Sequence, residues 1–456
     1  MSKDENLTSY NIEWIAGKTI TVMGLGVLGR GVNVAKFLLK NGVKKLLITD
    51  LKSNDQLQAS IKELEKYNDR IEYVLGRHRV QDFVETDLVV KAAGVPKDNR
   101  YITAALAAKV PVKMDASWAC SILGNKVKTI GVTGTKGKSS VTHLIAHILE
   151  VAGIPFQLGG NVRGQATLPL LNKISDKDIL LLELDSWQLQ GFHDEQISPN
   201  IAVFTNFMPD HLNYYAGMPD YFFDKSAIYR YQDKNDKLVL TKSSYEAMRL
   251  YDSEFKVKGS TAVVKPSIMR KDWHFTQPGQ HNRLNATQAY QVAKFLDISD
   301  EIIKEALETF PGVPGRLEFI DEINGVKFYN DTNATTPDAT AASIQAIRQS
   351  VDRCVVICGG ISKGFREFEV LIKALNSYVQ KVILLPGGIA DAIVDSLTTD
   401  YVMVSDMQSA VQQAYTIAIE TGAQSVVMSP AGSSFGLFKN EYDRGDQFVK
   451  AVKDLN

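Results

Sequence analysis

The chain of 456 residues is long enough for about three domains, since a single hydrophobic core rarely serves more than about 250–300 residues. Its 51 Lys and Arg balance 52 Asp and Glu, and a net charge of −1 carries no electrostatic signature of a nucleic-acid or anionic-membrane ligand. The first ten residues are polar, and no apolar run approaches the ~20 residues of a membrane span. We therefore expect a cytoplasmic enzyme without a signal peptide.

The cysteine content indicates neither a disulfide framework nor a metal site. The chain has three cysteines, at Cys120, Cys354 and Cys358, without metal-like spacing. Cys354 and Cys358 border an apolar Val-Val-Ile run, so we expect them to be buried in a strand.

The first predicted unit has the pattern of a nucleotide-binding βαβ motif. A strand over 18–23 leads into Gly24-Leu-Gly-Val-Leu-Gly29, followed by a helix over 30–40 and a strand over 45–50. Glycines in this G-x-G-x-x-G turn let backbone N–H groups approach a diphosphate. The motif alone is consistent with NAD or FAD and equally with another nucleotide diphosphate. A further strand over 88–92 runs into a loop expected to face a ligand.

The second predicted unit contains Gly134-Thr-Lys-Gly-Lys-Ser-Ser140, which follows a short apolar run and precedes a helical pattern over 141–151. Such a loop cradles phosphates: the helix N-terminus is positive, Lys138 supplies a point charge and Ser139 can ligate Mg²⁺. The general P-loop has four residues between its first glycine and its Gly-Lys pair. In this chain five residues separate Gly131 from the pair Gly137-Lys138. The compact form from Gly134 onward therefore indicates one ATPase family within the P-loop proteins.

Two apolar strands of this unit, over 179–184 and 201–205, end in polar residues. Ligands of parallel sheets lie at this carboxyl edge. Glu183 is a candidate Mg²⁺ ligand there, although a solvated strand end is the alternative. Asp210 and His211 follow the second strand, and a histidine beside an aspartate downstream of a P-loop favours a functional role.

A third polar cluster reads His281-Asn-Arg-Leu-Asn285. Asn282 and Asn285 are three residues apart, so they share one helical face and can hydrogen-bond a base, a ribose or a phosphate. A helix cap followed by an exposed helix is the alternative interpretation.

The third predicted unit follows the Pro/Gly cluster 310–315, which is typical of a domain boundary. Its expected strands lie at 326–329, 354–358, 381–385 and 425–429, with helical stretches between them that include 337–349. Strand–helix alternation predicts parallel sheets throughout this α/β protein. The predicted domains are 1–112, 113–311 and 312–456.

Candidate residues of the third unit follow its hinge and its strands. Arg316, just after the Pro/Gly cluster, could neutralise charge on a transferring phosphoryl group. The turn 330–337 is rich in Asx and Thr, and a series of helix caps is its alternative explanation. The segments 359–364 and 429–435 offer backbone N–H groups and hydroxyls suited to a small carboxylate ligand.

Taken in chain order, these motifs resemble the Mur ligases. The resemblance spans nearly the whole chain. It rests on Gly134–Ser140, Glu183, Thr205-Asn206…Asp210-His211, His281-Asn282…Asn285, Arg316, Asp331 and Gly360…Lys363-Gly364. It implies a Rossmann-like domain for a UDP-sugar, a central P-loop ATPase domain with a mostly parallel sheet, and a Rossmann-like C-terminal domain for an amino acid. It also favours UDP over a redox cofactor at the first glycine turn.

The activity implied by the resemblance is peptidoglycan precursor synthesis. An ATP-dependent ligase of this kind adds D-glutamate to UDP-N-acetylmuramoyl-L-alanine through an acyl phosphate. Its partners are small molecules, its cofactors are ATP and two Mg²⁺ ions, and the resemblance implies a monomer. Lys225 aligns with a family lysine that becomes carbamylated and supports the second Mg²⁺.

The resemblance assigns individual residues to each ligand. For the UDP-sugar it implies Gly26, Val27, Leu28, Gly29, Asp50, Lys52, Gly94 and Asn161. For ATP it implies Gly134, Thr135, Lys136, Gly137, Lys138, Ser139, Ser140, Asn282, Asn285, Arg316 and Asp331. For the metals it implies Ser139, Glu183, His211 and Lys225. For the incoming amino acid it implies Thr335, Lys363, Ser434 and Phe435. The catalytic set is Lys138, His211, Lys225 and Arg316.

Departures from the family pattern leave alternatives open. Asp185 replaces a serine, Gly315 a histidine, and Asn333 a lysine expected near the glutamate carboxylate. A ligase of the same family that adds L-glutamate or another amino acid therefore remains possible. A folylpolyglutamate-type enzyme would lack the nucleotide-type domain before the P-loop. An NAD-dependent oxidoreductase leaves the P-loop unexplained, and a non-catalytic nucleotide-binding regulator does not need the intact Lys138.

Overall fold

The computed structural model forms two compact units, which are described separately. One comprises residues 1–273 and 284–307, and the other residues 274–283 and 308–456. The structure describes residues 12–162, 164–211, 214–266, 273, 275, 277, 280–348, 353–362, 367–434 and 436–455.

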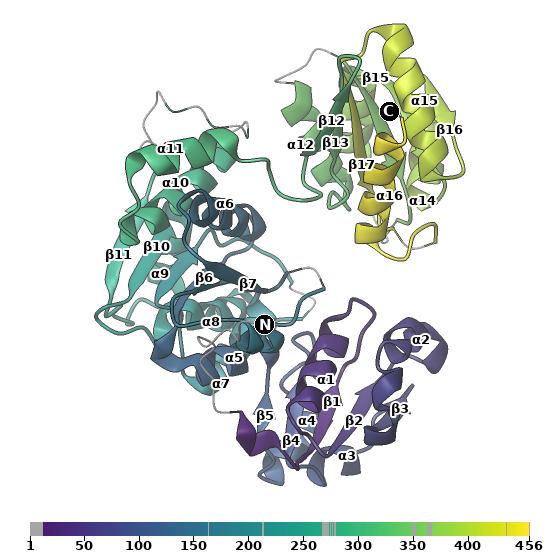
Figure 1. The fold of residues 1–456 in the computed structure, drawn as a ribbon. Coiled ribbons are helices and arrows are strands. Elements are labelled where there is room, and N and C mark those ends of the chain that lie inside the picture. Colours follow the sequence, from purple (N-terminus) through teal and green to yellow (C-terminus); the bar gives the residue numbers. More distant parts are fainter. Residues whose placement is uncertain are drawn as a thin grey trace, which may run out of the picture. The chain divides into compact units, whose positions relative to one another are not determined.

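The first sheet of the larger unit has five parallel strands in the order β3-β2-β1-β4-β5 (Figure 1). Its strands are β1 Thr19–Met23, β2 Lys45–Asp50, β3 Ile71–Leu75, β4 Leu88–Lys91 and β5 Val112–Lys113. Its helices are α1 Arg30–Lys40, α2 Asn54–Lys62, α3 Gln81–Val84 and α4 Arg100–Ala107, with short 3₁₀ turns at Glu13–Ile15 and Glu65–Arg70. The order reverses at β1, so the Gly24–Gly29 turn lies where parallel sheets bind ligands.

The second sheet of this unit has six parallel strands in the order β11-β10-β9-β6-β8-β7. They are β6 Lys128–Thr133, β7 Phe156–Gly160, β8 Ile179–Glu183, β9 Ile201–Phe204, β10 Lys237–Thr241 and β11 Ser260–Val264. The helices are α5 Asp115–Leu123, α6 Lys138–Val151, α7 Ser186–Glu195, α8 Met218–Arg230, α9 Lys242–Tyr251, α10 Gln280–Phe295 and α11 Asp300–Thr309, with 3₁₀ turns at Gly124–Lys126 and Leu168–Asn172. Strand β8 is buried along its whole length, as expected for a parallel strand covered on both faces.

The third sheet belongs to the other unit and has the order β12-β13-β17-β14-β15-β16. Its strands are β12 Glu318–Ile323, β13 Val326–Asn330, β14 Cys354–Gly359, β15 Val379–Leu385, β16 Tyr401–Met403 and β17 Ser425–Ala431. Its helices are α12 Pro337–Arg348, α13 Glu369–Tyr378, α14 Gly388–Ile393, α15 Met407–Thr421 and α16 Glu441–Lys453, with a 3₁₀ turn at Val394–Ser396.

The prediction of parallel sheets throughout is wrong for β12. This strand pairs antiparallel with β13, whereas the other pairs of the third sheet are parallel. Only Asn324 and Gly325 separate the two strands, and both have positive φ angles, of 49° and 81°. A two-residue turn of this kind forces a hairpin, because a parallel crossover needs a dozen or more residues.

The apolar run 127–130 predicts a short strand before the P-loop, and the observed strand β6 extends three residues further, to Thr133. Strand β6 continues through Gly131 to Thr133, where it pairs with β8 and β9. A side chain at Gly131 would meet Pro199 at 2.5 Å and Ile228 of α8 at 2.9 Å, so this glycine lets α8 and the residues before β9 pack closely against the strand. The helix begins at Lys138, and the compact loop from Gly134 is the only connection between the two elements.

The three cysteines are core residues. Cys120, Cys354 and Cys358 are 8%, 2% and 0% exposed, and the latter two lie in β14, as predicted. Burial raises the pKa of the Cys354 and Cys358 thiols to about 12 and raises that of Cys120 as well. No helix among the described residues is long and apolar enough to cross a membrane.

Candidate active site

The P-loop, Gly134–Ser140, requires glycine at both of its bends. Gly134 has φ 145°, and a Cβ there would lie 1.9 Å from Thr205 Oγ1. Gly137 has φ 82°, and a Cβ there would lie 2.8 Å from the side-chain oxygen of Asn285. The backbone can therefore turn tightly into α6 and present its N–H groups at the helix N-terminus. Asn285 of α10 lies directly against this loop.

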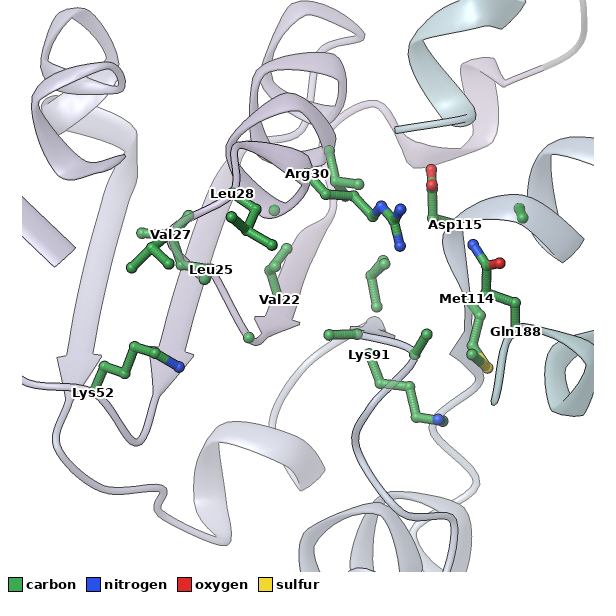
Figure 2. A pocket seen from close by; sticks show the side chains of 18 residues that line it. Val22, Leu25, Val27, Leu28, Arg30, Lys52, Lys91, Met114, Asp115 and Gln188 are labelled. Carbon is green, nitrogen blue, oxygen red and sulfur yellow. The ribbon is translucent and has the colours of Figure 1, made fainter. Parts of the chain in front are cut away.

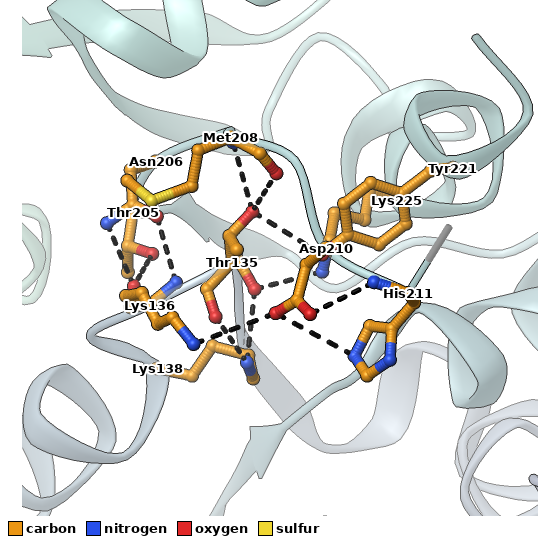
Figure 3. A network of polar contacts seen from close by, with 11 residues as sticks. Thr135, Lys136, Lys138, Thr205, Asn206, Met208, Asp210, His211, Tyr221 and Lys225 are labelled. Carbon is orange, nitrogen blue, oxygen red and sulfur yellow. Dashed lines mark hydrogen bonds and ion pairs between the residues drawn. The ribbon is translucent and has the colours of Figure 1, made fainter. Parts of the chain in front are cut away.

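The segment after β9 holds the P-loop in shape (Figure 3). The backbone N–H of Thr135 donates to Asn206 O at 3.0 Å, and that of Lys136 donates to Asn206 Oδ1 at 2.9 Å. In return, Thr205 Oγ1 and Asn206 Nδ2 donate to Lys136 O at 2.6 and 3.0 Å. Thr205 and Asn206 thus act on the loop backbone and fix its conformation.

Two lysines converge on one carbonyl oxygen. The Nζ atoms of Lys138 and Lys225 donate to Gly134 O at 3.1 and 2.9 Å. Lys225 is 1% exposed, and its Nζ lies over the Tyr221 ring, 4.9 Å from the centroid. Burial, together with the nearby Lys138 ammonium, lowers the pKa of Lys225 well below its usual value. The site therefore favours a neutral amine at Lys225.

Asp210 and His211 form the exposed rim beside the loop. His211 has φ 54°, its backbone N–H donates to Asp210 Oδ1 at 2.9 Å, and its Nε2 lies 4.0 Å from Asp210 Oδ2. Lys136 Nζ lies 3.7 Å from the same carboxylate oxygen. The His211 ring packs against Trp187 with centroids 4.9 Å apart. Asp210 thus lies near both His211 and the P-loop residue Lys136.

Glu183 lies at the end of β8 and is 5% exposed. Its backbone oxygen accepts the N–H of Asn161 at 2.6 Å, and a Cβ at Gly160 would lie 2.1 Å from the same oxygen. Gly160 is paired with Glu183 in the sheet register. A candidate sugar-nucleotide residue, Asn161, is therefore joined directly to a candidate metal ligand.

The replacement of a family serine by Asp185 has a local explanation. Its carboxylate accepts the N–H of Gln188 at 2.8 Å, and the Gln188 side chain accepts the N–H of Asp185 at 3.3 Å. This capping box starts α7. The substitution therefore serves the helix that follows Glu183.

A cavity of about 270 Å³ lies between the Gly24–Gly29 turn, the end of β4 and the start of α5 (Figure 2). We call it the glycine-turn cavity. Of the predicted UDP-sugar residues, Gly26, Val27, Leu28 and Lys52 line it; Gly29, Asp50, Gly94 and Asn161 do not. Asp50 instead accepts the N–H groups of Gly26 and Lys52 at 3.0 and 2.9 Å, so its carboxylate shapes the turn.

Sequence reasoning missed two cations of this cavity, Arg30 and Lys91. Lys91 is 3% exposed and donates to Val95 O at 2.8 Å. Burial, assisted by the nearby Lys97, lowers its pKa to about 8. Arg30 did carry a signal: it is the first residue of α1, where a cation opposes the helix macrodipole. A residue unfavourable to its own helix indicates a tertiary role.

In the other unit, Asp331 is 4% exposed and accepts Ser429 Oγ–H at 2.7 Å and the N–H of Leu317 at 3.1 Å. Burial raises the pKa of its carboxyl to about 6. Arg316, one residue before Leu317, is exposed. Asn333 donates through Nδ2 to Pro314 O at 3.1 Å, so it fastens the turn that precedes Arg316.

The fully buried Arg444 joins the two turns of this unit, and it was not predicted as a site residue. It donates to Thr332 O at 2.8 Å, to Thr332 Oγ1 at 3.1 Å and to Gly432 O at 3.0 Å. Ser434, two residues after Gly432, is 3% exposed. Its hydroxyl has no hydrogen-bond partner in the part of the chain that the structure describes. A buried, unpaired hydroxyl is available to a ligand.

The predicted site residues beyond the larger unit fall into two groups. Asn282, Arg316, Asp331, Thr335 and Ser434 belong to the smaller unit and are placed within it alone. Lys363 and Phe435 lie outside the described residues.

The P-loop and the glycine-turn cavity define a nucleotide-binding α/β protein. Three family models match the chain: "Mur ligase MurD-like, N-terminal domain" at residues 18–113, "Mur ligase middle domain" at 132–299, and "Mur ligase, glutamate ligase domain" at 315–432. The chain belongs to the Mur ligase family, which confirms the resemblance and its three α/β domains.

Individual relatives agree with this assignment. The chain is 34% identical to the UDP-N-acetylmuramoylalanine–D-glutamate ligase of Borreliella afzelii, over 97% of this chain and 99% of that protein. It is 32% identical to the ligase of the same name from Streptococcus pneumoniae, over 96% and 98%. The structure of UDP-N-acetylmuramate-alanine ligase from Thermotoga maritima matches with a TM-score of 0.60 and 20% identity, over 96% of this chain and 100% of that one. This last likeness concerns the fold alone.

Proposed function

We propose that this protein is an ATP-dependent ligase of peptidoglycan precursor synthesis that joins D-glutamate to UDP-N-acetylmuramoyl-L-alanine. Relatives with this activity in their names match it over nearly their full length. One structural observation carries the proposal. The glycine-turn cavity and the P-loop belong to the same unit, and the contact between Asn161 and Glu183 links their surroundings.

The proposed reaction activates a carboxylate that an amine cannot attack directly. The alanine carboxylate attacks the γ-phosphorus of ATP, so that ADP leaves and an acyl phosphate forms. The neutral amine of glutamate then attacks the acyl carbon, phosphate leaves, and the amine loses a proton as the amide forms. Lys138 and Arg316 would stabilise the charge on the transferring phosphoryl group.

The residues around the P-loop fit Mg²⁺ and ATP. The glycines at positions 134 and 137 let the loop pack directly against Thr205 and Asn285, so the loop keeps the tight turn that would present its N–H groups to phosphates. Ser139, Glu183 and His211 would hold the metal. No group of three or more His, Cys, Asp or Glu side chains among the described residues can bind a metal ion. Phosphate oxygens would therefore complete the coordination, and the ion would neutralise phosphate charge.

Lys225 has the environment of a carbamylated lysine. Its lowered pKa favours the neutral amine, which adds to CO₂ to give N-carboxylysine and a proton. The product places an anion beside the Lys138 ammonium, where a second cation would be repelled. It also supplies oxygen ligands for a second Mg²⁺.

The remaining substrate contacts are assigned by ligand. ATP would contact Gly134–Ser140, Asn282, Asn285, Arg316 and Asp331, and the amino acid would contact Thr335, Lys363, Ser434 and Phe435. The unpaired hydroxyl of Ser434 supports the second assignment. We also propose domains at 1–112, 113–311 and 312–456, and a cytoplasmic monomer, because one chain carries every residue assigned to the site.

A phosphate-release assay tests the activity. ATP, Mg²⁺ and UDP-N-acetylmuramoyl-L-alanine are supplied with D-glutamate, L-glutamate and other amino acids in parallel. We expect release with D-glutamate only. Release that never depends on an amino acid would refute the ligase, whereas preference for L-glutamate would change the stereochemical assignment alone.

A pair of lysine variants ties the activity to the P-loop. Lys138→Ala removes the cation at the loop and should abolish turnover. Lys128→Ala removes an exposed cation at the opposite end of β6 and should leave turnover unchanged. Equal turnover in the two variants would contradict the phosphate role of Lys138.

A further inference from the structure

Arg30 occupies a position that its own helix does not favour. It is the first residue of α1, directly after the Gly24–Gly29 turn, and it lines the glycine-turn cavity (Figure 2). A cation in the first turn opposes the helix macrodipole. The reason for an arginine here must therefore lie in what its guanidinium contacts.

Part of the guanidinium grips a loop of the neighbouring sheet. Nε donates to Gln165 O at 3.2 Å, and Nη2 lies 3.1 Å from Gly160 O, 3.3 Å from Val162 O and 3.4 Å from Asn161 Oδ1. Gly160 is the last residue of β7, and Asn161, Val162 and Gln165 follow it in the chain. Arg30 therefore orients the loop that carries Asn161.

A second side chain of α1 holds the same loop without charge. Asn33 Nδ2 donates to Gly164 O at 2.7 Å. Because Asn33 is absent from the lining of the glycine-turn cavity, it offers a matched control for the gripping role alone.

One arm of the guanidinium, Nη1, has no hydrogen-bond partner among the described residues. Arg30 also forms no ion pair in that part of the chain. The carboxylate that lines the cavity, Asp115, accepts the N–H groups of Thr167 and Leu168, at 2.8–3.0 Å. The two N–H donors of Nη1 therefore remain for a ligand in the cavity. The pKa of Asp115 is raised by burial, and the nearby Arg30 charge partly offsets this effect.

We propose that Arg30 binds the diphosphate of the sugar nucleotide through Nη1, while its Nε and Nη2 hold Gly160, Asn161, Val162 and Gln165 in place. The planar guanidinium suits this double task, because its donors point in fixed, separate directions. Lys52 and Lys91 supply two further basic side chains to the same cavity. The inference deepens the proposed function and depends on it for the identity of the ligand.

Titration with UDP and with uridine separates the phosphate contact from the loop contact. UDP is titrated calorimetrically into the wild type, Arg30→Gln, Arg30→Lys and Asn33→Ala, and uridine binding is followed by ligand-observed NMR. We expect Arg30→Gln to weaken UDP about tenfold or more, which corresponds to about 1.4 kcal/mol, and to leave uridine within about twofold. Arg30→Lys should recover part of the loss, and Asn33→Ala should stay within about threefold of the wild type.

Several results would overturn the inference. Equal weakening of UDP by Arg30→Gln and Asn33→Ala, or equal weakening of UDP and uridine by Arg30→Gln, would reduce Arg30 to a structural role. A wild type that does not bind UDP would also refute it. The phosphate-release assay keeps the two proposals apart: Arg30-dependent UDP binding without acceptor-dependent release would refute the ligase and leave this inference standing.

Discussion

Lys138 and Lys225 donate to the same carbonyl oxygen, yet their surroundings suit the two amines to different chemistry. Both amines donate to Gly134 O, but Lys225 is 1% exposed and its Nζ lies over the Tyr221 ring. Desolvation disfavours its charged form, whereas a phosphate ligand would stabilise the charge on Lys138. The same residue type is thus suited to electrostatics at one position and to covalent modification at the other.

The carbamate at Lys225 is testable with chemical rescue. Lys225→Ala should lower the rate of phosphate release by about a hundredfold, a loss of the size of one ligand group that acts at the transferring phosphoryl. Short carboxylates such as acetate should restore part of the rate, because they supply the missing anion. The bulkier Lys225→Arg retains a cation and should not respond. A ¹³C signal from N-carboxylysine under ¹³CO₂ measures the modification directly, and its absence from the active wild type would contradict it.

Asp331 should give the smaller unit a distinct pH dependence. Burial raises the pKa of its carboxyl from 3.8 to about 6, so between these values the unfolded chain loses a proton that the folded chain keeps. Folding stability therefore falls as pH rises through this window, and the cost is complete above about pH 6. The free energy of unfolding of Asp331→Asn, measured relative to that of the wild type, should therefore rise by about 2 kcal/mol from pH 4.5 to pH 7.5. Urea unfolding at both pH values measures the difference, and a pH-independent difference would contradict the argument.

At the scale of elements, the features with a local sequence signal were predicted better than those that depend on contacts between distant residues. The helix over 30–40 and the strand over 45–50 have the predicted bounds, because a glycine turn and an apolar run mark them locally. The β12–β13 hairpin also had a local signal, the Asn324-Gly325 turn, which the strand–helix alternation obscured. Arg30 was missed because its acceptors lie 130 or more residues away in the sequence, and Arg444 because its two bonds to Thr332 span 112 residues.

Glycine substitutions test the connection between the two candidate ligand sites. Gly160 and Gly153 both have positive φ, of 81° and 66°, but a Cβ at Gly160 would lie 2.1 Å from Glu183 O, whereas nothing lies within 4 Å of one at Gly153. Gly153→Ala should cost about 1 kcal/mol of stability through backbone strain alone. Gly160→Ala should cost roughly 3 kcal/mol, because β7 must also move away from β8.

The functional readout of this pair is the Mg²⁺ dependence of phosphate release. Gly160→Ala displaces Glu183 and should raise the Mg²⁺ concentration needed for half-maximal rate, while Gly153→Ala should not. An unchanged Mg²⁺ requirement in Gly160→Ala would argue against a metal role for Glu183.

For the whole molecule, the division into two units predicts separable responses to ligands. The glycine-turn cavity lies within the larger unit. A ligand present at about 100 times its Kd stabilises the unit that binds it by about 2.7 kcal/mol. In scanning calorimetry, UDP should raise the unfolding transition of the larger unit and leave that of the smaller unit in place. A shift of both transitions would show that the units unfold as one.

The order of motifs along the chain was sufficient to predict the family and its three α/β domains. Most of these motifs lie at junctions between a strand and a helix that are formed by adjacent residues. Their chemistry can therefore be predicted from a short stretch of sequence. The replacement of a lysine by Asn333 could not be interpreted in the same way. Asn333 donates to Pro314 O, and this contact depends on how the turn 330–337 folds back on the segment 310–315.

The burial of all three thiols has a practical consequence. A chain whose only cysteines are core residues with raised pKa values reacts slowly with maleimides, since the thiolate is the reactive form. A cysteine introduced at an exposed position of each unit, such as Leu250→Cys and Ile419→Cys, could then be labelled selectively with a donor–acceptor dye pair. The natural sequence is therefore already a suitable background for single-molecule fluorescence during turnover.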